Sequence, residues 1–445
     1  MSKADNALFL KDPAGDYPTI VRGEGIYLHD DEGRRWIDGA AGASNVTLGH
    51  GRSDIARVLG DQAETLAYAF SIHFESQPAR EYAARLTALA PGDLNKAYFV
   101  SGGSEAIESA MKIARQYHLL RGRESKQLLI SRWGGYHGGT LGAMSLSGVP
   151  GPRAPFASWL ADFPHIAPCH PYRCRFEGCN GVCNLACADD LEVEIRRRGP
   201  ENVAAFVCEP VPIAAFVCGV PPEGYFSRVR EICDRHDVLF IADEIVTGFG
   251  RGGRLFAMEH WDVLPDMIVF GKGASSGYMP LGGVLMRQAI ADAFADAGQE
   301  FHHIFTYVNN PLAMRVGLEV LDIIEREEIL AHVCEMAAHL EHRSRCFLDR
   351  PSVGEVRTFG LILGIELVQD RERRQPFPAE AGFGRRVARH MRERGLNGAT
   401  TSGCADGVNG DDLRFYPPLT ITRPELDTLL DIVEESLAAA EKEVL

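Results

Sequence analysis

The sequence of 445 residues has no apolar run long enough to cross a membrane, and its first residues lack the unbroken apolar stretch of a secretory signal. Basic residues are few: 46 Lys and Arg stand against 61 Asp and Glu, a formal net charge of −15. Such a surface would repel phosphates over most of its area, so we expect neither a nucleic-acid nor a membrane partner. Long repeats and low-complexity tracts are also absent. Small-molecule chemistry is the remaining default.

The eleven cysteines are an odd number, and no secretory signal accompanies them. We therefore expect reduced thiols in a cytoplasmic protein and no disulfide scaffold. Several crowd one stretch near His165 and His170, where cysteine and histidine together could close a zinc site. The spacing favours plain thiols over a structural metal, because the intervals of four, three and three residues differ from the two-residue knuckles of common zinc modules. The four cysteines of that alternative are Cys174, Cys179, Cys183 and Cys187.

From about residue 97 onward, short apolar runs alternate with amphipathic stretches, the pattern of a parallel sheet with helices on both faces. Apolar residues recur at helical spacing over 225–233, which predicts a strand-helix-strand crossover. After about residue 325 the pattern changes, and a final helix is expected at Pro424–Val444. The predicted strands are Ala97–Val100, Gln127–Ser131, Val203–Cys208, Val238–Ala242 and Met267–Phe270.

A glycine pair follows the first of these strands. Ser101-Gly102-Gly103-Ser104 lies between that strand and a predicted helix whose inner face begins at Ile107. Unpaired N–H groups at a helix N-terminus point outward, and glycine lets a phosphate approach them, while the Ser104 hydroxyl can add a donor. The motif indicates a phosphate site, with an ordinary tight turn capped by Ser104 as the alternative.

Two charged residues stand at strand ends, where ligands of open α/β sheets bind. Asp243 follows the apolar run that ends at Ala242, and Lys272 follows Phe270 between two glycines. A lysine among apolar neighbours has its charged form disfavoured, which gives the neutral amine needed for a Schiff base with pyridoxal phosphate. A carboxylate beside the ring nitrogen of that cofactor keeps the ring cationic and electron-accepting. The alternatives are an Asp243 that caps the next turn and a solvated loop lysine.

Two more motifs lie at the exits of predicted strands, on the same edge of the sheet. Tyr136-His137-Gly138 follows the strand at 127–131, and Glu209-Pro210-Val211 follows the strand at 203–208. An aromatic ring there could stack on the cofactor ring, and Glu209 could reach its polar edge. Ordinary loop packing is the alternative for either residue.

Taken together, these motifs resemble the class III, or ω-amino-acid, aminotransferases of the fold-type I pyridoxal-phosphate superfamily. The resemblance is carried by SGGSEAIESAMKIAR at 101–115, YHG at 136–138, IADEIVTGFGR at 241–251, GKG at 271–273, HIFTYVNNP at 303–311 and LRFYPPLTIT at 413–422. It implies an α/β fold, with a mostly parallel seven-stranded sheet sandwiched by helices and a smaller α+β C-terminal domain. The implied parts are an N-terminal segment at 1–60 that packs with the small domain, a large cofactor-binding domain at 61–325 and the small domain at 326–445.

The same resemblance implies a role for each motif residue. Lys272 would hold the cofactor covalently and shuttle a proton between substrate and cofactor, and Asp243 would pair with the ring nitrogen. Arg414 would clamp a substrate carboxylate, which suits its planar fork, with a surface ion pair as the alternative. The contacts to the phosphate, the two ring faces and the ring hydroxyl would come from Gly103, Ser104, Tyr136, Ile245 and Glu209 and, from the neighbouring subunit, Thr306. An isolated subunit would then have an incomplete site, so we expect a homodimer or a dimer of dimers.

The expected reaction moves an amino group from an ω-amino acid or amine donor to a keto-acid acceptor, with pyruvate favoured as acceptor by analogy with the family. A first alternative keeps the cofactor but changes the reaction to that of an aminomutase, a racemase or a decarboxylating aminotransferase. A second alternative is a non-catalytic metal-binding protein built around the cysteines. That alternative gives Lys272 and Asp243 no reason to stand at neighbouring strand ends, so the aminotransferase is favoured.

Overall fold

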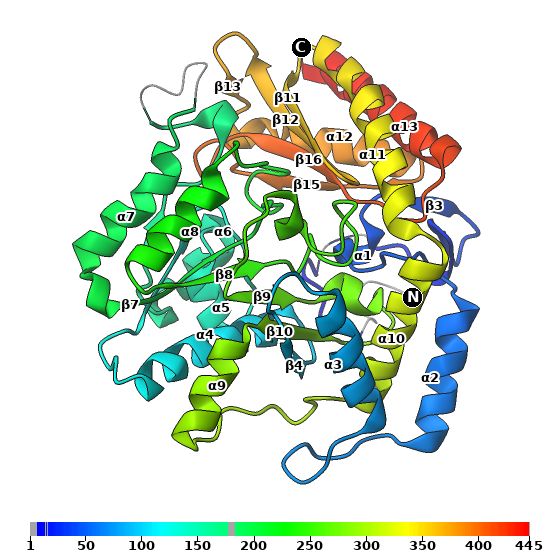
Figure 1. The fold of residues 1–445 in the computed structure, drawn as a ribbon. Helices are drawn as coiled ribbons and strands as arrows, with labels where there is room; N and C mark the ends of the chain where they lie inside the picture. Colours follow the sequence, from blue (N-terminus) through cyan, green and yellow to red (C-terminus); the bar gives the residue numbers. More distant parts are fainter. Residues whose placement is uncertain (1–6, 14, 16, 177–182, 445) are drawn as a thin grey trace.

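The computed structural model describes residues 7–13, 15, 17–176 and 183–444. Within them, the large central sheet has seven strands in the order β4-β10-β9-β8-β7-β5-β6 (Figure 1). β6, β5, β7, β8 and β9 pair in parallel, and β10 is antiparallel to both of its neighbours. These strands are β4 (Lys96–Val100), β5 (Leu128–Arg132), β6 (His165–Ile166), β7 (Val203–Cys208), β8 (Leu239–Asp243), β9 (Met267–Phe270) and β10 (Gly282–Met286).

Two smaller sheets accompany the large one. The N-terminal sheet has the order β1-β2-β3-β14, in which β14 comes from near the C-terminus and pairs parallel with β3. The C-terminal sheet is antiparallel in the order β11-β12-β16-β15, and β13 pairs with β12. Their strands are β1 (Ile20–Glu24), β2 (Tyr27–Asp30), β3 (Arg35–Asp38), β11 (Val353–Phe359), β12 (Ile362–Asp370), β13 (Gln375–Pro376), β14 (Leu396–Asn397), β15 (Ala399–Ser402) and β16 (Asp411–Phe415).

Helices surround these sheets, and in Figure 1 α11 and α13 lie beside the C-terminal sheet while α4 and α9 lie near the large sheet. No helix among the described residues is long and apolar enough to cross a membrane. The helices are α1 (Ala41–Ser44), α2 (Ser53–Thr65), α3 (Gln77–Leu89), α4 (Gly103–Leu120), α5 (Leu141–Leu146), α6 (Pro150–Arg153), α7 (Ala186–Arg198), α8 (Tyr225–Arg235), α9 (Gln288–Ala297), α10 (Pro311–Arg326), α11 (Ile329–Ser344), α12 (Phe383–Glu393) and α13 (Arg423–Val444).

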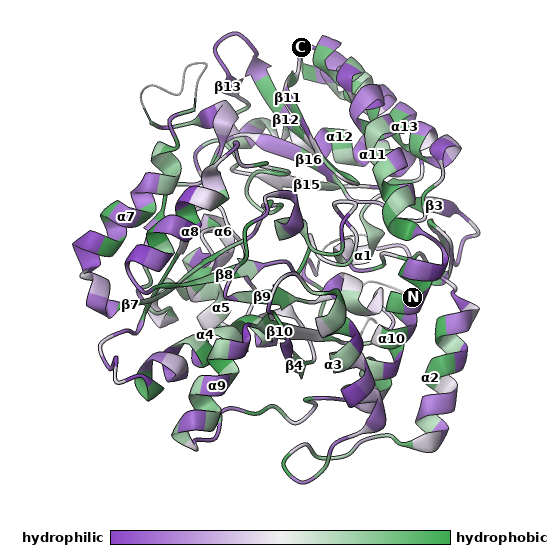
Figure 2. Ribbon diagram, in the orientation of Figure 1, coloured by the Kyte–Doolittle hydropathy of each residue, from purple (hydrophilic) through white to green (hydrophobic). Residues whose placement is uncertain are grey.

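The large sheet is buried on both faces, and every residue of β7, β8, β9 and β10 is buried. Side chains alternate along a strand, so Phe206 and Phe240 join the core that contains the apolar face of α8, while Val207 and Ile241 join the core beneath α4. Figure 2 shows β7 and β8 as hydrophobic, whereas the surrounding helices alternate hydrophobic and hydrophilic residues. Because both faces of these strands are packed, the carboxyl ends of the strands, which carry the site, are held in place.

The prediction of a mostly parallel seven-stranded sheet is confirmed. Val203–Cys208 and Met267–Phe270 have the predicted bounds, and the other three predicted strands differ by one residue at an end or at both ends. Asp243 is therefore the last residue of β8 and not the residue after it. β10 was not among the predicted strands, because its opening glycines lower strand propensity. Gly283 is nevertheless required there, since a Cβ would lie 2.6 Å from the Tyr98 carbonyl oxygen.

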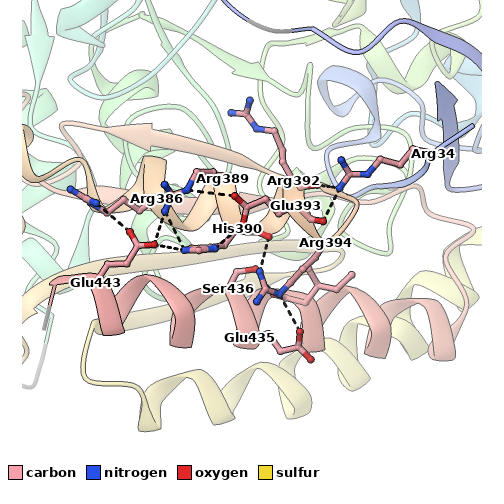
Figure 3. A network of polar contacts seen from close by, with 11 residues as sticks. Arg34, Arg386, Arg389, His390, Arg392, Glu393, Arg394, Glu435, Ser436 and Glu443 are labelled. Atoms are coloured by element: carbon pink, nitrogen blue, oxygen red, sulfur yellow. Dashed lines mark hydrogen bonds and ion pairs between the residues drawn. The ribbon is translucent and has the colours of Figure 1, made fainter. Parts of the chain in front are cut away.

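An ionic network joins α12 to α13 on the outer side of the C-terminal sheet (Figure 3). Glu443 accepts from Arg386 at 3.2 Å and from Arg389 at 2.6 Å, and its Oε1 lies 2.8 Å from Nε2 of His390. Arg34 of the N-terminal segment donates to the carbonyl of Glu393 at 2.8 Å. The Arg386 and Arg389 side chains are about half exposed, so solvent screens these ion pairs and each adds little to stability. The network connects the N-terminal segment to the C-terminal helices without reaching the site.

Candidate active site

The predicted site residues meet at one edge of the large sheet. β4 points the same way as β9, because both pair antiparallel with β10, and β5, β7 and β8 are parallel to β9. Their carboxyl ends therefore lie along one edge, where open α/β sheets bind ligands. Tyr136 and Glu209 follow β5 and β7, Asp243 ends β8, Lys272 follows β9, and Gly103 opens α4 after β4.

Asp243 is buried and has two hydrogen-bonding contacts. Its Oδ2 lies 2.7 Å from Nδ1 of His137, and its Oδ1 accepts from the backbone N–H of Ile245 at 3.1 Å. Burial alone would lower the pKa of His137, but the hydrogen bond and the charge of Asp243 outweigh burial and raise it. The hydrogen bond to Ile245 is the turn cap that the alternative interpretation of Asp243 predicts. Asp243 makes this contact and also contacts His137. A cation placed against Asp243 would meet a carboxylate held in position by a buried imidazole.

The Lys272 amine donates to the Ser44 hydroxyl oxygen at 2.9 Å. Burial lowers the pKa of Lys272 to about 8, and the nearby charge of Asp243 opposes part of that shift. With this pKa, roughly one amine in ten is neutral at pH 7, far more than for a solvated lysine. Lys272 also adopts a left-handed backbone conformation with φ 41°. The structure therefore excludes the solvated loop lysine and supplies an amine that can act as a nucleophile and a base.

Glu209 is buried, and burial raises its pKa to about 7. Its Oε1 accepts from the backbone N–H of Tyr136 at 3.3 Å. Its Oε2 is buried and has no hydrogen-bond partner among the described residues. A buried oxygen without a partner costs about 1–3 kcal/mol, so this oxygen is suited to a donor that a ligand would bring.

Gly103 and Ser104 begin α4 next to the loop at 138–139. The Ser104 hydroxyl oxygen accepts from the Gly139 N–H at 3.0 Å, and no side chain caps the helix. A Cβ at Gly103 would lie 2.7 Å from the Ile245 side chain, and one at Gly138 would lie 2.5 Å from the Ser104 hydroxyl oxygen. Because no side chain caps α4, the alternative interpretation of an ordinary turn capped by Ser104 is wrong. Glycine at 103 and 138 thus allows Ile245 and Ser104 to pack against the start of α4, whose backbone N–H groups are of the kind that bind anions.

The remaining three predicted site residues differ in exposure: Arg414 is near enough for its charge to act on the Lys272 amine, whereas Tyr136 and Thr306 are exposed. Arg414, on β16, donates to the Ile213 carbonyl at 3.3 Å, and its Nε is buried without a partner among the described residues. Tyr136 is 45% exposed. Thr306 is exposed, and its carbonyl accepts from the Tyr68 hydroxyl. The single chain thus brings Lys272 and its buried neighbours together and leaves Tyr136 and Thr306 at the surface.

The predicted cysteine site lies partly outside the described residues, because Cys179 falls within 177–182. In the part of the chain that the structure describes, no group of three potential metal ligands includes Cys174, Cys183 or Cys187. Cys187 is buried and its thiol is hydrogen-bonded to that of Cys169. The structural metal stays the untested alternative to plain thiols.

The sequence alone assigned no function to two residues of this site, His137 and Ser44. His137 stood in the Tyr-His-Gly motif, but nothing in that motif showed that its ring would meet Asp243. Ser44 carried no signal at all, because it lies 228 positions from Lys272 in the chain. Both contacts are products of the tertiary fold.

Comparisons with known proteins identify the family. The family model described as aminotransferase class III matches residues 13–437. The chain belongs to the class III aminotransferases. YodT, an uncharacterised aminotransferase of Bacillus subtilis, is 37% identical over 431 residues, covering 96% of this chain and 96% of YodT. A putrescine–pyruvate aminotransferase of Pseudomonas aeruginosa is 34% identical over 426 residues, covering 94% of this chain and 90% of that relative. The ω-transaminase of Pseudomonas jessenii in complex with PMP has a TM-score of 0.90 at 33% identity, covering 96% of this aminotransferase and 94% of that one.

Class III aminotransferases use pyridoxal phosphate, and the residues of this aminotransferase fit that cofactor. The site offers a buried carboxylate at Asp243, a partly neutral amine at Lys272 and an unpartnered oxygen on Glu209. It also offers a glycine-bordered helix N-terminus at Gly103. When bound, the cofactor supplies an electron-accepting ring that stabilises negative charge on the substrate carbon. The Lys272 amine would suit the cofactor's aldehyde, and Asp243 would suit its ring nitrogen. Glu209 would suit the ring hydroxyl, and the helix N-terminus at Gly103 would suit the phosphate.

Proposed function

We propose that this aminotransferase moves an amino group from an ω-amino acid or an amine to a keto acid, with pyruvate as acceptor. The Lys272 amine carries the proposal, because burial brings its pKa to about 8 within a site that also holds the Asp243–His137 pair. Such an amine can attack a carbonyl and carry a proton near neutral pH. Support for the acceptor comes from the relative of Pseudomonas aeruginosa that is named for putrescine and pyruvate.

Around the cofactor, we assign each residue the contact that its chemistry suits. Lys272 holds the cofactor covalently and moves the proton, and Asp243 pairs with the ring nitrogen. Glu209 faces the ring hydroxyl, because its Oε2 lacks another partner among the described residues. The phosphate contacts come from Gly103 and Ser104 and, in trans, from Thr306, while Tyr136 and Ile245 take the two ring faces.

Arg414 is assigned to the substrate carboxylate. Its hydrogen bond to the Ile213 carbonyl fixes the guanidinium and leaves Nε without a partner among the described residues. The planar fork can then bind a carboxylate through two donors. Replacing Arg414 with methionine is expected to raise KM for pyruvate and for carboxylate-bearing donors, while donors without a carboxylate lose little. Equal losses with both kinds of donor would contradict the assignment.

Lys272→Ala tests the central assignment. The natural protein should show a visible-absorbing cofactor that borohydride fixes to the peptide containing Lys272. The variant should retain at most loosely bound cofactor and lose turnover by several orders of magnitude, since both the nucleophile and the proton carrier are gone. A fully active variant with tightly bound cofactor would refute the proposal.

Adding the donor alone separates transamination from the related reactions. A transaminase converts its bound cofactor to the amine form and stops until a keto acid is added, whereas a racemase accumulates no amine form. A panel of ω-amino acids, diamines and simple amines, each with pyruvate or 2-oxoglutarate, then identifies the substrates. Preference for 2-oxoglutarate over pyruvate would contradict the proposed acceptor.

The subunit arrangement is proposed from Thr306, which is exposed in the single chain. If each site takes Thr306 from its neighbour, a mixed dimer of Lys272→Ala and Thr306→Ala subunits contains one site with both native residues. Co-expression of the two variants should therefore restore cofactor affinity and activity at that site. A mixed dimer no better than the Thr306→Ala homodimer would exclude the contribution in trans.

A further inference from the structure

Ser44 is, among the described residues, the side chain to which the Lys272 amine is hydrogen-bonded. The distance from Nζ to the hydroxyl oxygen is 2.9 Å, and Ser44 is 2% exposed. The Ser44 hydroxyl donates its own hydrogen to the Ala43 carbonyl at 2.5 Å. With that hydrogen committed, the oxygen presents its lone pairs to the amine, so Ser44 acts as an acceptor.

The backbone of Ser44 is left-handed, with φ 62°. Only a few per cent of residues other than glycine adopt this region, because Cβ crowds the following carbonyl. Glycine would adopt it without that strain. What serine offers here and glycine does not is a side chain, and the hydroxyl of that side chain contacts Lys272. Strain of this kind beside a functional group indicates a role for the strained residue.

A buried carboxylate fixes the turn that carries Ser44. Asp38 is fully buried, and its Oδ2 accepts from the Gly42 N–H at 2.7 Å. The same carboxylate lies 3.0 Å from Nε2 of His50 and accepts from the Asn397 amide at 3.0 Å. These contacts come from three separate segments of the chain. The Ser44 hydroxyl is therefore held on a rigid turn, which suits it for orienting another group.

We propose that Ser44 is a positioning residue that holds the Lys272 amine while that amine takes up and delivers the substrate proton. The inference rests on the proposed function, in which Lys272 moves this proton. A neutral amine that donates one N–H to a fixed oxygen has its lone pair restricted to the two remaining tetrahedral directions, which favours proton transfer over a short distance. Ser44 neither gains nor loses a proton, because its hydroxyl keeps its hydrogen and donates it in a hydrogen bond to the Ala43 carbonyl.

Ser44→Ala and Ser44→Gly test the proposal as a matched pair. Both remove the hydroxyl, but only alanine keeps the strained Cβ, so the glycine variant should be at least as stable in thermal unfolding of the cofactor-free protein. In single turnovers with saturating donor, both variants should slow about tenfold, the worth of one hydrogen bond. Donor affinity should not change. The isotope effect with α-deuterated donor should increase in both, because proton transfer becomes more rate-limiting.

The cofactor-free protein gives a second readout. Trace acylation across pH, with peptide mapping, reports the pKa of Lys272, which should fall in both variants because the ammonium loses an acceptor. The charged groups that face the amine are unchanged in these variants, so the shift reports the hydroxyl. The charges that act on the amine include those of Asp243, Arg414, Glu209 and Arg251.

Two results would overturn the role of Ser44. One is a natural single-turnover rate and isotope effect in either variant. The other is a slowing confined to the less stable variant, which would show that loss of stability and not loss of the hydroxyl is responsible. An inactive Lys272→Ala beside natural-rate Ser44 variants would leave the proposed function intact, so the two proposals fail separately.

Discussion

Replacing Arg357 with methionine is expected to destabilise the aminotransferase more at pH 8 than at pH 6. Arg357 is buried, and its guanidinium donates to Asp412 at 2.9 Å, to Glu366 at 3.0 Å and to the Val217 carbonyl at 2.6 Å. Methionine fills much of the same space but leaves two buried carboxyl groups without that cation. Removing one side of a buried ionic cluster costs about 3–5 kcal/mol, which we expect at pH 8.

The pH dependence follows from Asp412, whose pKa burial raises to about 7 even with Arg357 present. Losing the cation raises that pKa further. A carboxyl group with a higher pKa in the folded than in the unfolded protein weakens folding as pH rises toward the folded value. Below about pH 7 both proteins keep the proton, so the difference between them is constant. Above it, only the variant keeps the proton, and the difference grows by up to about 1.4 kcal/mol per pH unit.

Thermal unfolding of the cofactor-loaded proteins measures this difference. Taking about 2.1 cal/mol/K per residue for the unfolding entropy, a loss of about 3–5 kcal/mol lowers Tm by roughly 3–5 °C for the whole chain. Arg373→Met is the matched control, because the Arg373 side chain is 82% exposed and lies 3.9 Å from its acidic partner. It should change stability by less than about 0.5 kcal/mol. Equal losses in the two variants, or the same Arg357→Met loss at pH 6 and pH 8, would refute the reasoning.

Three further predictions concern the site. His137→Phe removes the charge-assisted contact of Asp243, worth about 1.5–3 kcal/mol, so kcat should fall roughly tenfold to a hundredfold; an unchanged kcat would contradict the contact's importance. Gly138→Ala places a Cβ 2.5 Å from a hydroxyl oxygen at φ 142° and should weaken cofactor binding in absorbance titrations, whereas Gly139→Ala, which meets nothing within 4 Å, should not. Cofactor uptake by the cofactor-free protein should rise from pH 6.5 to 8 and level off above the Lys272 pKa of about 8, because only the neutral amine reacts; a flat profile would argue against that pKa.

The sequence predicted the sheet and the central residues of the site because their signals are local. An apolar run that ends at a charged residue marks both the strand and its carboxyl end, and parallel pairing then places those ends along one edge. Lys272 and Asp243 were found in this way, and the structure places both at that edge. Glu209 followed from the same rule, since β7 ends one residue before it.

The contacts that tune these residues could not be predicted in the same way. His137 and Asp243 are 106 positions apart, and the direction of a loop side chain is decided by tertiary packing. The left-handed turn at Ser44 gave no warning, because serine is not the residue that this conformation normally selects. The charge cluster around Arg357 joins strands that also meet only in the folded chain.

The pairing of β3 with β14 has a consequence for synthesis of the chain. Asp38 and its partner Asn397 are 359 positions apart, so the ribosome releases the N-terminal hairpin long before the strand that completes it exists. During that interval β3 has an open edge, which is a template for wrong pairing. We expect the nascent chain to need chaperone protection there, and truncations that remove β14 to aggregate through this edge.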